Sequence, residues 1–218
     1  AASLDGTVTV AWFDMAASDR VAISAADSRL LDWSAPTCIS DPVDFVSNPT
    51  DFYANDNNRI QIAYAPDGLL SVAWCTSDGS NTRIYAACRD GRTKRWARPV
   101  QLSTDANGSD PQIGTSRNGS VAVVWMVRGL KMFASIRESS SERWSTPAIL
   151  PGGPGDFPSI AGNSGGDFLV AFAASDGGGA RVQSSTFVAT SGRWAAPEPL
   201  SLAGGTAFQQ RGAATNRG

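Results

Sequence analysis

Apolar positions in this chain fall in short runs of β-branched and aromatic residues, which glycine, asparagine, aspartate and serine separate. The pattern is clearest between residues 111 and 150, where runs occupy 111–116, 120–125, 131–137 and 144–150. Runs of this length and composition are typical of β-strands. Asn-Gly and Asp-Gly steps, which favour tight hairpins, lie between such runs at 67–68, 78–79, 118–119 and 176–177. The pattern predicts short antiparallel strands joined by hairpins.

A short motif recurs along the chain and shows that these strands belong to a repeat. Trp-x-x-Pro begins at Trp33, Trp96, Trp144 and Trp194, and a basic residue stands thirteen positions before each tryptophan, at Arg20, Arg83, Lys131 and Arg181. A second aromatic position, at Trp12, Trp74, Trp125 and Phe172, lies six residues after a glycine, at Gly6, Gly68, Gly119 and Gly166. The constant six-residue step predicts that the glycine occupies a turn. Constant offsets in four copies indicate a repeat array.

A unit of about 50 residues that holds four antiparallel strands is the sequence signature of a propeller blade. The chain is therefore predicted to be all-β, a β-propeller of four four-stranded antiparallel blades that form one domain over residues 1–218. The predicted blades are 1–40 together with 207–218, 57–103, 109–150 and 156–201, and residues 41–56 are an insert.

The two ends of the chain correspond to the same place in the repeat. Residues 1–6 and 213–218 both match the end of a first strand before the turn glycine. The C-terminal stretch from 207 is long enough for a whole strand, so we expect it to complete the first blade. The ring would then close on itself, or the strand would pair with another chain and cause self-association, because an unpaired strand edge invites pairing. A third alternative is that the chain is a piece of a longer propeller.

The repeated aromatic residues have two interpretations. They could pack neighbouring blades together, since each ring buries roughly 150 to 250 Å². They could instead form platforms for sugar rings. One aromatic per strand in every blade favours packing, and so we treat the following eight as structural: Trp12, Trp33, Trp74, Trp96, Trp125, Trp144, Phe172 and Trp194.

Composition and charge exclude several classes of function. Hydrophobic residues make up 42% of the chain, charged residues 17%, and there are 22 glycines and 12 prolines, which fits short strands and tight turns. The net charge of −2 and the lack of a basic run disfavour nucleic acid and membrane partners. The small residues at the start would suit the mature end of an exported protein as well as an arbitrary boundary, and the expected location is extracellular or periplasmic.

Histidine is absent, which excludes Ser-His-Asp chemistry, Cys-His chemistry and histidine-bound zinc. Three cysteines, Cys38, Cys75 and Cys88, are too few for a disulfide framework and lack metal-binding spacing. We expect them to be buried free thiols, and we expect no metal and no cofactor.

The repeat resembles those of the sialidase-like superfamily, the neuraminidase or Asp-box (BNR-type) β-propellers. The resemblance covers residues 6–200 through Gly-x5-Trp, a Ser-Asp-Gly type of turn and Trp-x-x-Pro, and its nearest Asp-box match is the degenerate stretch from Cys88 to Trp96. In that family the Asp-box stabilises a turn remote from the active site. The resemblance implies a propeller fold, and for a working sialidase it implies an arginine cluster, a Tyr–Glu nucleophile pair and an Asp acid/base.

One connection between repeats is about twelve residues longer than the others and is the first place to expect a binding site. It holds acids and aromatics at Asp44, Phe45, Asp51, Phe52, Tyr53 and Asp56. In a propeller this connection emerges on the face where the third strands begin with Arg20, Arg83, Lys131 and Arg181. The insert could equally be a plain surface loop, and the bases could be solvated charges repeated by duplication.

Two functions follow from these patterns. The first is a non-catalytic, lectin-like module that binds carbohydrate, or an adhesive or scaffold part of a secreted protein. The second is a sialidase-like glycoside hydrolase. The family's Arg-Ile-Pro motif is absent, and the three glutamates, Glu138, Glu142 and Glu198, lie away from the expected ligand face. We therefore predict no catalytic residues and rank binding above hydrolysis.

Overall fold

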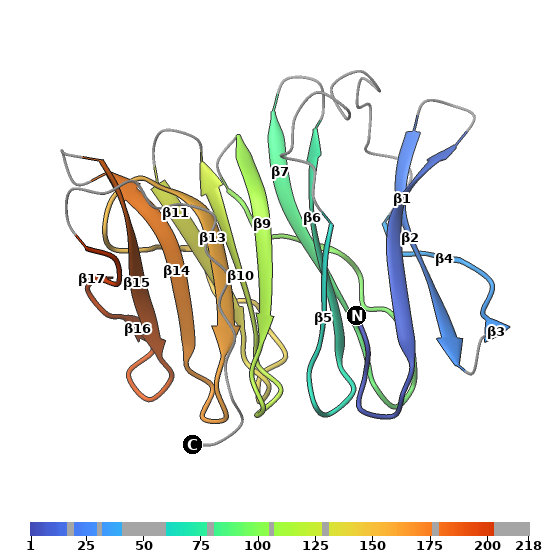
Figure 1. Ribbon diagram of the computed structural model, residues 1–218. Helices are drawn as coiled ribbons and strands as arrows, with labels where there is room; N and C mark the ends of the chain where they lie inside the picture. The colour runs from blue at the N-terminus through green and yellow to red at the C-terminus, as the bar shows by residue number, and fades with distance from the viewer. Residues whose placement is uncertain are drawn as a thin grey trace. The chain divides into compact units, whose positions relative to one another are not determined.

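The computed structural model describes residues 1–16, 20–29, 32–40, 60–77, 81–104, 107–127, 131–175 and 179–202. Every regular element within these ranges is a β-strand, and none of them contains a helix long and apolar enough to cross a membrane. The chain divides into two compact units, Ala1–Pro111 and Gln112–Gly218. Four antiparallel sheets are present, as Figure 1 shows, which confirms the all-β class and the four sheets of the repeat.

The first unit contains two sheets. In the first sheet β1 pairs with β2, and the two short strands β3 and β4 both pair with the far edge of β2. The second sheet follows the order β5-β6-β7-β8. The bounds are β1 Val8–Ala16, β2 Arg20–Arg29, β3 Asp32–Trp33, β4 Thr37–Cys38, β5 Gln61–Tyr64, β6 Leu70–Ser77, β7 Thr82–Arg89 and β8 Val100–Gln101.

The second unit repeats this plan, and its first strand begins a few residues before the boundary between the units. One sheet has the order β9-β10-β11-β12, and the other has β13-β14-β15-β16 with β17 also paired to β15. The bounds are β9 Gly108–Thr115, β10 Val121–Val127, β11 Lys131–Arg137, β12 Ala148–Ile149, β13 Gly155–Gly162, β14 Phe168–Ser175, β15 Ala180–Val188, β16 Arg193–Trp194 and β17 Glu198–Pro199.

The glycine that precedes the second strand of each repeat has the backbone conformation that the spacing suggested. The φ angles are +82° at Gly6, +85° at Gly68, +85° at Gly119 and +94° at Gly166. Residues with a Cβ rarely adopt this left-handed region. The prediction of a turn glycine is confirmed in all four copies.

The fourth strand of each repeat differs from the single continuous strand expected over residues 144–150. Trp144 pairs with Arg137 in an isolated bridge, and pairing resumes only at Ala148, opposite Ala134. Pro147 separates the two contacts. Because proline has no N–H to donate, it is tolerated only at an outer edge and interrupts the pairing there. The outer strand therefore consists of two short pieces.

Each unit has its own hydrophobic core between its two sheets. In the first unit Trp74 and Val72 of β6 pack with Ala25 of β2 and with Ile39. In the second unit Phe168 and Phe172 of β14 lie in a cluster with Met132 of β11 and other aliphatic residues. The second and third strands of a repeat thus supply most of the buried apolar surface.

Within the described residues, the first sheet has only a trace of the strand that begins the other repeats. Ala2 forms an isolated antiparallel bridge with Val8, and the backbones of Ala1 and Thr9 are hydrogen bonded. Residues 207–218, which we expect to supply the rest, lie outside the described residues. The closure of the ring, the number of blades and the boundaries of the single domain stay predictions.

The structure joins none of the three described cysteines in a disulfide, and the three differ in burial. Cys75 and Cys88 are buried, whereas Cys38 is exposed, so the expectation of a buried thiol is wrong at that position. Cys75 pairs in register with Ile84, and Cys88 with Ser71. Burial raises the pKa of the Cys75 thiol to about 12 and keeps it protonated.

Candidate functional site

The four bases of the repeat lie at the predicted place on their strands. Arg20 and Lys131 are the first residues of β2 and β11, and Arg83 and Arg181 are the second residues of β7 and β15. In each sheet this is the end where the hairpin from the second strand enters the third strand. The repeat thus supplies one cation at the same position of every sheet.

The described bases have different surroundings. Lys131 is exposed, and Arg83 is partly buried. Arg181 is also partly buried, and its Nε and Nη2 donate to the carbonyl oxygen of Ser201 at 3.3 and 2.9 Å. The side chain of Arg20 lies outside what the structure describes. Arg181 is therefore bonded to the outer segment of its own sheet, and Lys131 has the most open surroundings of the three bases whose side chains the structure describes.

The insert falls outside the described residues. Asp44, Phe45, Asp51, Phe52, Tyr53 and Asp56 all belong to the stretch from 41 to 59 that the structure does not describe. Their convergence with the bases stays a prediction.

The repeated aromatic residues fall into two groups. On the second strands, Trp74, Trp125 and Phe172 are at most 1% exposed and Trp12 is partly buried. On the outer strands, Trp96, Trp144 and Trp194 are partly buried, but Trp33 is 55% exposed. The second-strand aromatics belong to the interior of the sheets, and Trp33 presents about half of its surface to solvent.

The structure describes the three glutamates and two of the three tyrosines that sialidase-type chemistry could use. Glu138 and Glu142 lie in the turn after β11, Glu198 lies in β17, and all three are exposed. The hydroxyl of Tyr85 donates to Gln101 at 3.1 Å. A tyrosine activated by glutamate is therefore not found among these residues.

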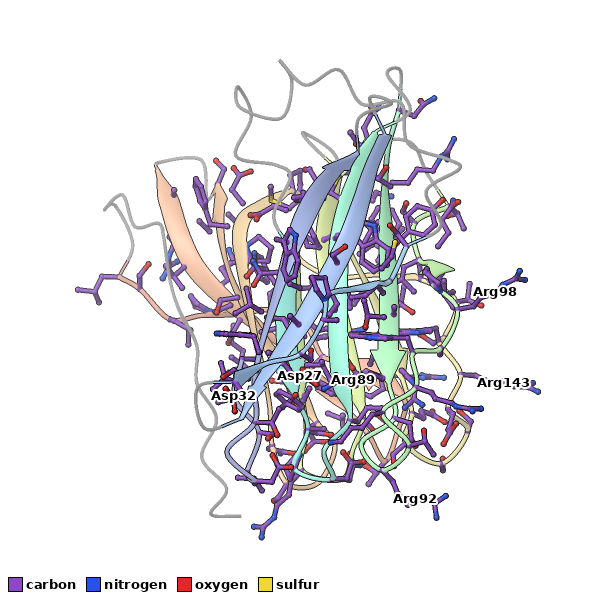
Figure 2. All side chains as sticks on the ribbon, turned by 90° about the vertical axis from the view of Figure 1, so that its right-hand side faces the viewer. Asp27, Asp32, Arg89, Arg92, Arg98 and Arg143 are labelled. Carbon is purple, nitrogen blue, oxygen red and sulfur yellow. The ribbon has the colours of Figure 1, made fainter. Side chains whose placement is uncertain are left out.

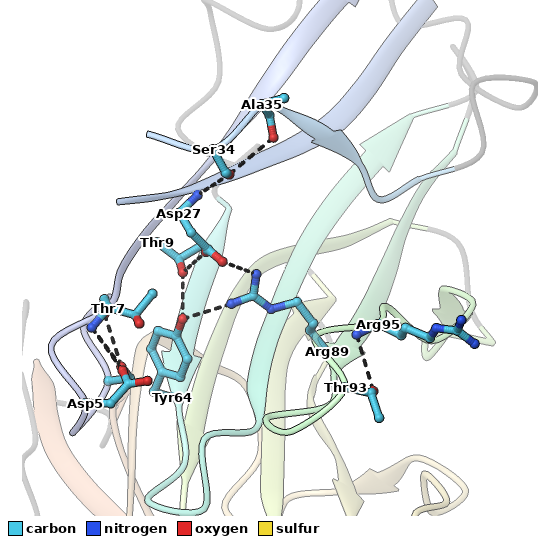
Figure 3. A network of polar contacts seen from close by, with 11 residues as sticks. Asp5, Thr7, Thr9, Asp27, Ser34, Ala35, Tyr64, Arg89, Thr93 and Arg95 are labelled. Carbon is cyan, nitrogen blue, oxygen red and sulfur yellow. Dashed lines mark hydrogen bonds and ion pairs between the residues drawn. The ribbon is translucent and has the colours of Figure 1, made fainter. Parts of the chain in front are cut away.

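A polar cluster that the sequence did not suggest joins the two sheets of the first unit (Figure 3). Arg89 donates from Nη1 to Asp27 Oδ2 at 2.5 Å and from Nη2 to the hydroxyl of Tyr64 at 3.0 Å. Thr9 lies 2.5 Å from Asp27 Oδ1 and 2.7 Å from the Tyr64 hydroxyl. The guanidinium of Arg89 also lies 5.5 Å from the ring centre of Trp96. Thr9 and Asp27 come from one sheet, and Tyr64 and Arg89 from the other.

The electrostatics of this cluster stabilise an ionised carboxylate. Burial opposes the charge on Asp27, but hydrogen bonds from Arg89 and Thr9 outweigh it, so the pKa of Asp27 lies below its usual value. Arg89 is 7% exposed and Thr9 is fully buried. Figure 2 shows Asp27 and Arg89 among the strands, whereas Arg92 and Arg98 extend away from them. We interpret the cluster as a contact that stabilises the packing of the two sheets of the first unit.

The same positions in the other sheets show why the sequence did not reveal this cluster. Arg89 faces Trp96, and the residues that face the matching tryptophans are Ser28, Arg137 and Phe187. Thr9 and Asp27 lie opposite each other on the second and third strands of their repeat. The matching cross-strand pairs in the other three sheets are Ser71 with Cys88, Ala122 with Ile136, and Leu169 with Thr186. Among the described residues, only the first unit has an acid at the position of Asp27 in one sheet and a base at the position of Arg89 in the other. The sequence signal that could have revealed the cluster was Asp27, because the matching residues of the other three sheets are uncharged.

The degenerate Asp-box forms a turn of the kind that the resemblance implies. Asp90 accepts hydrogen bonds from the backbone N–H groups of Arg92 at 3.1 Å and Thr93 at 2.5 Å. The bond from Thr93 is the main reason that the pKa of Asp90 is lowered. The motif stabilises the turn between the third and fourth strands.

Several solved structures share the fold at low sequence identity. A polysaccharide lyase, the PL25 ulvan lyase, matches with a TM-score of 0.57 and 11% identity over 92% of this chain and 54% of the lyase. A protein of unknown function from Dyadobacter fermentans matches with a TM-score of 0.58 and 11% identity over 92% of this chain and 67% of that protein. The NanB sialidase from Streptococcus pneumoniae matches with a TM-score of 0.51 and 14% identity over 84% of this chain and 29% of the sialidase.

This chain spans about half the length of the ulvan lyase. No protein-family model and no curated protein sequence matches it. At such identities the likeness concerns the fold, and it supports a propeller-like arrangement of the four sheets.

Proposed function

We propose that the protein is a propeller-type module that binds saccharides without cleaving them. The observation that carries the proposal is the base at the start of the third strand in all four repeats, at Arg20, Arg83, Lys131 and Arg181. A ligand with an acid group would be neutralised at such a position, and arginine is well suited to a carboxylate or sulfate because it can donate two parallel hydrogen bonds.

The likeness in fold adds a second line of support. One of the similar structures is described as an ulvan lyase bound to a saccharide of glucuronate and sulfated rhamnose, and another is a sialidase. Proteins with this arrangement of sheets can therefore act on acidic glycans. We therefore propose that this chain binds an acidic saccharide at the end of the sheets where the repeated bases stand.

The insert would supply the remaining contacts. Phe45, Phe52 and Tyr53 offer flat apolar faces for sugar C–H groups, and Asp44, Asp51 and Asp56 can accept hydrogen bonds from hydroxyls. The proposal includes an extracellular or periplasmic location, where polysaccharides are encountered.

Binding is preferred to hydrolysis because the three glutamates are exposed and the hydroxyl of Tyr85 donates to Gln101. The second candidate, a sialidase-like glycoside hydrolase, needs a Tyr–Glu pair, and Tyr53 of the insert is the tyrosine left for that role. A fluorogenic sialoside tests it. Turnover that is lost in Tyr53→Phe would replace the binding proposal by the enzymatic one.

A glycan array that contains sulfated, uronate-rich, sialylated and neutral glycans tests the binding proposal. We expect acidic glycans to bind and Lys131→Ala and Tyr53→Ala to weaken them. Lys94→Ala is the matched control, since Lys94 is the other lysine of the chain and lies in the turn at the opposite end of its sheet. Equal binding by Lys131→Ala and Lys94→Ala, or no bound acidic glycan, would rule the proposal out.

A further inference from the structure

A groove of about 440 Å³ lies in the second unit, at the end of its sheets opposite to Lys131 and Arg181. Most of its lining comes from the turns beside β10, β11, β14 and β15, and Ile136 of β11 and Phe187 of β15 are the two lining residues that lie in strands. Its volume falls in the range of about 300 to 1,000 Å³ that small-molecule sites occupy. Nine residues line it, and six of them matter for its chemistry and rigidity: Asn118, Ser120, Ile136, Glu138, Phe187 and Ala189.

The first unit has different chemistry at the repeat positions that line this groove. Ile136 and Phe187 occupy the repeat positions of Asp27 and Arg89, which meet in an ion pair across the first unit. Close to that pair, Gly91 approaches Gly68 so tightly that a Cβ on Gly91 would lie 2.6 Å from the Gly68 carbonyl carbon. In the first unit charged side chains meet at this place. In the second unit apolar side chains line it and leave it open.

Hydrogen bonds hold the walls of the groove in place. Asn118 Oδ1 accepts from the backbone N–H of Ser120 at 3.0 Å and from the hydroxyl of Ser116. The hydroxyl of Ser120 in turn accepts from the backbone N–H of Ser139 at 3.3 Å. On the other side Asp167 accepts from the N–H of Ala189 at 2.8 Å. A preformed groove loses little conformational freedom when a ligand enters, which favours binding.

The chemistry of the lining selects a class of ligand. Ile136 is buried and Phe187 is partly buried, so the floor presents an aliphatic side chain and an aromatic ring. Glu138 is the single ionisable group in the lining, and it is exposed. A carboxylate accepts hydrogen bonds from hydroxyls strongly but repels an anion. An apolar floor beneath an acceptor-rich rim matches a pyranose ring, which has a C–H face and a hydroxyl edge.

We propose that this groove is a second saccharide site that binds an uncharged sugar ring, with Phe187 beneath the ring and Glu138 accepting from its hydroxyls. It is independent of the function proposed above, because it lies at the other end of the sheets and has the opposite charge preference. The protein would then hold a neutral sugar and an acidic sugar at opposite ends of its strands.

The test titrates the ¹⁵N-labelled protein with galactose, glucose and N-acetylglucosamine as neutral probes, glucosamine as a cationic probe and glucuronic acid as an anionic probe. We expect a neutral sugar to shift the amide signals of Ser139, Ser140 and Ala189, and glucuronic acid to bind at least tenfold more weakly. Stronger binding of glucosamine than of every neutral probe would overturn the assignment to an uncharged ring and make the groove a cation site.

Variants of the lining residues distinguish sugar binding in the groove from unspecific effects of a substitution. Glu138→Gln removes a charged acceptor and should weaken the neutral sugar about tenfold. Glu142→Gln is the matched control, because Glu142 lies in the same turn but pairs with Arg137 and does not line the groove.

Phe187→Leu keeps an apolar floor but removes the aromatic face, and it should also weaken binding. Equal effects of Glu138→Gln and Glu142→Gln, or no shift of the groove signals with any neutral sugar, would overturn the proposal. Lys131→Ala should leave this binding unchanged, so the two sites can fail separately.

Discussion

Asp27 and Arg89 show how two neighbouring positions of the repeat can carry charged residues in one unit and apolar residues in the other. In the first unit the buried Arg89 and the partly buried Asp27 form an ion pair, and Thr9 and Tyr64 are hydrogen bonded to it. At the same positions in the second unit stand Ile136 and Phe187. Replacing a buried ion pair by well-packed apolar residues is often neutral for stability, whereas removing one partner leaves an uncompensated charge.

This comparison predicts the outcome of a double-mutant cycle. Asp27→Asn should lower the free energy of unfolding by about 2 to 4 kcal/mol, because Arg89 stays buried without its counter-ion. The double variant Asp27→Ile with Arg89→Phe, which copies the second unit, should recover at least half of that loss. Denaturant titration measures both. A double variant less stable than Asp27→Asn would mean that the cluster contributes more than an apolar contact can replace.

The pH dependence of stability tests the same pair. The pKa of Asp27 is lower in the folded protein than its ordinary value of about 4. A lowered carboxyl pKa contributes stability that is complete above the ordinary value and is lost as the pH falls through the folded value. The stability difference between the parent and Asp27→Asn should therefore be constant from pH 7 to 5 and shrink below pH 4. A difference that grows on acidification would contradict the direction of the shift.

Trp74 tests the packing role of the repeated aromatics. It is 1% exposed and lies in the core of the first unit, and its indole Nε1 has no hydrogen-bond partner among the described residues. Trp74→Ala should cost about 3 to 5 kcal/mol, as large-to-small changes in cores do. Trp74→Phe should cost less than half as much, because it keeps a ring and removes the unpaired N–H. Chemical denaturation compares the two, and equal losses would mean that the indole N–H has a partner.

At the scale of the element, the sequence predicted the inner strands of each sheet better than the outer strand. The third strand of the third repeat was expected at 131–137 and is found at Lys131–Arg137. Its neighbour in the outer position was expected to be continuous from 144 and is broken beside Pro147. The inner strands are set by alternating and β-branched residues, which a sequence shows directly. The outer strand depends on which carbonyl and N–H groups remain free to pair, and this follows from the folded sheet.

The hairpin glycines allow a prediction with an adjacent control. Gly166 has φ +94°, and a Cβ there would lie 2.4 Å from Asn118 Nδ2, whereas at Gly165 the nearest atom would be 3.5 Å away and the φ angle is not in the left-handed region. Gly166→Ala should therefore destabilise the protein by at least about 1 kcal/mol, and Gly165→Ala should be close to neutral. Thermal melts of the two variants provide the measurement. Equal melting temperatures would show that this turn can relax at no cost.

At the scale of the whole molecule, the repeat predicted the four sheets but could not predict how binding residues are arranged. The positions of Arg83, Lys131 and Arg181 on their strands followed from a constant spacing. The groove in the second unit did not, because it arises where Phe187 replaces the arginine of another repeat. Periodicity describes what the repeats share, and binding sites form where one copy differs from the next.

The edge of β1 bears on how the sheets are assembled. β1 pairs with β2 along its length, but on its other side the described residues supply only the bridge between Ala2 and Val8. Val8 and Val10 of this strand are 41% and 46% exposed. An open strand edge with exposed valines is a template for pairing with another strand. Residues 207–218 fill the matching place in the repeat, and we expect them to occupy this edge from the same chain or from a second copy.

Deleting residues 207–218 tests that expectation. Loss of a paired strand should lower the melting temperature by several degrees, since about 1 kcal/mol corresponds to 2 to 4 °C in a domain of this size. Light scattering on the intact chain distinguishes the two modes of pairing, because exchange between two chains doubles the mass and the deletion then returns it to that of a monomer. A closed single ring would keep the monomer mass before the deletion and lose stability after it. An unchanged melting temperature together with an unchanged mass would show that the segment does not complete the first sheet, and the edge of β1 would then have to be covered by something else.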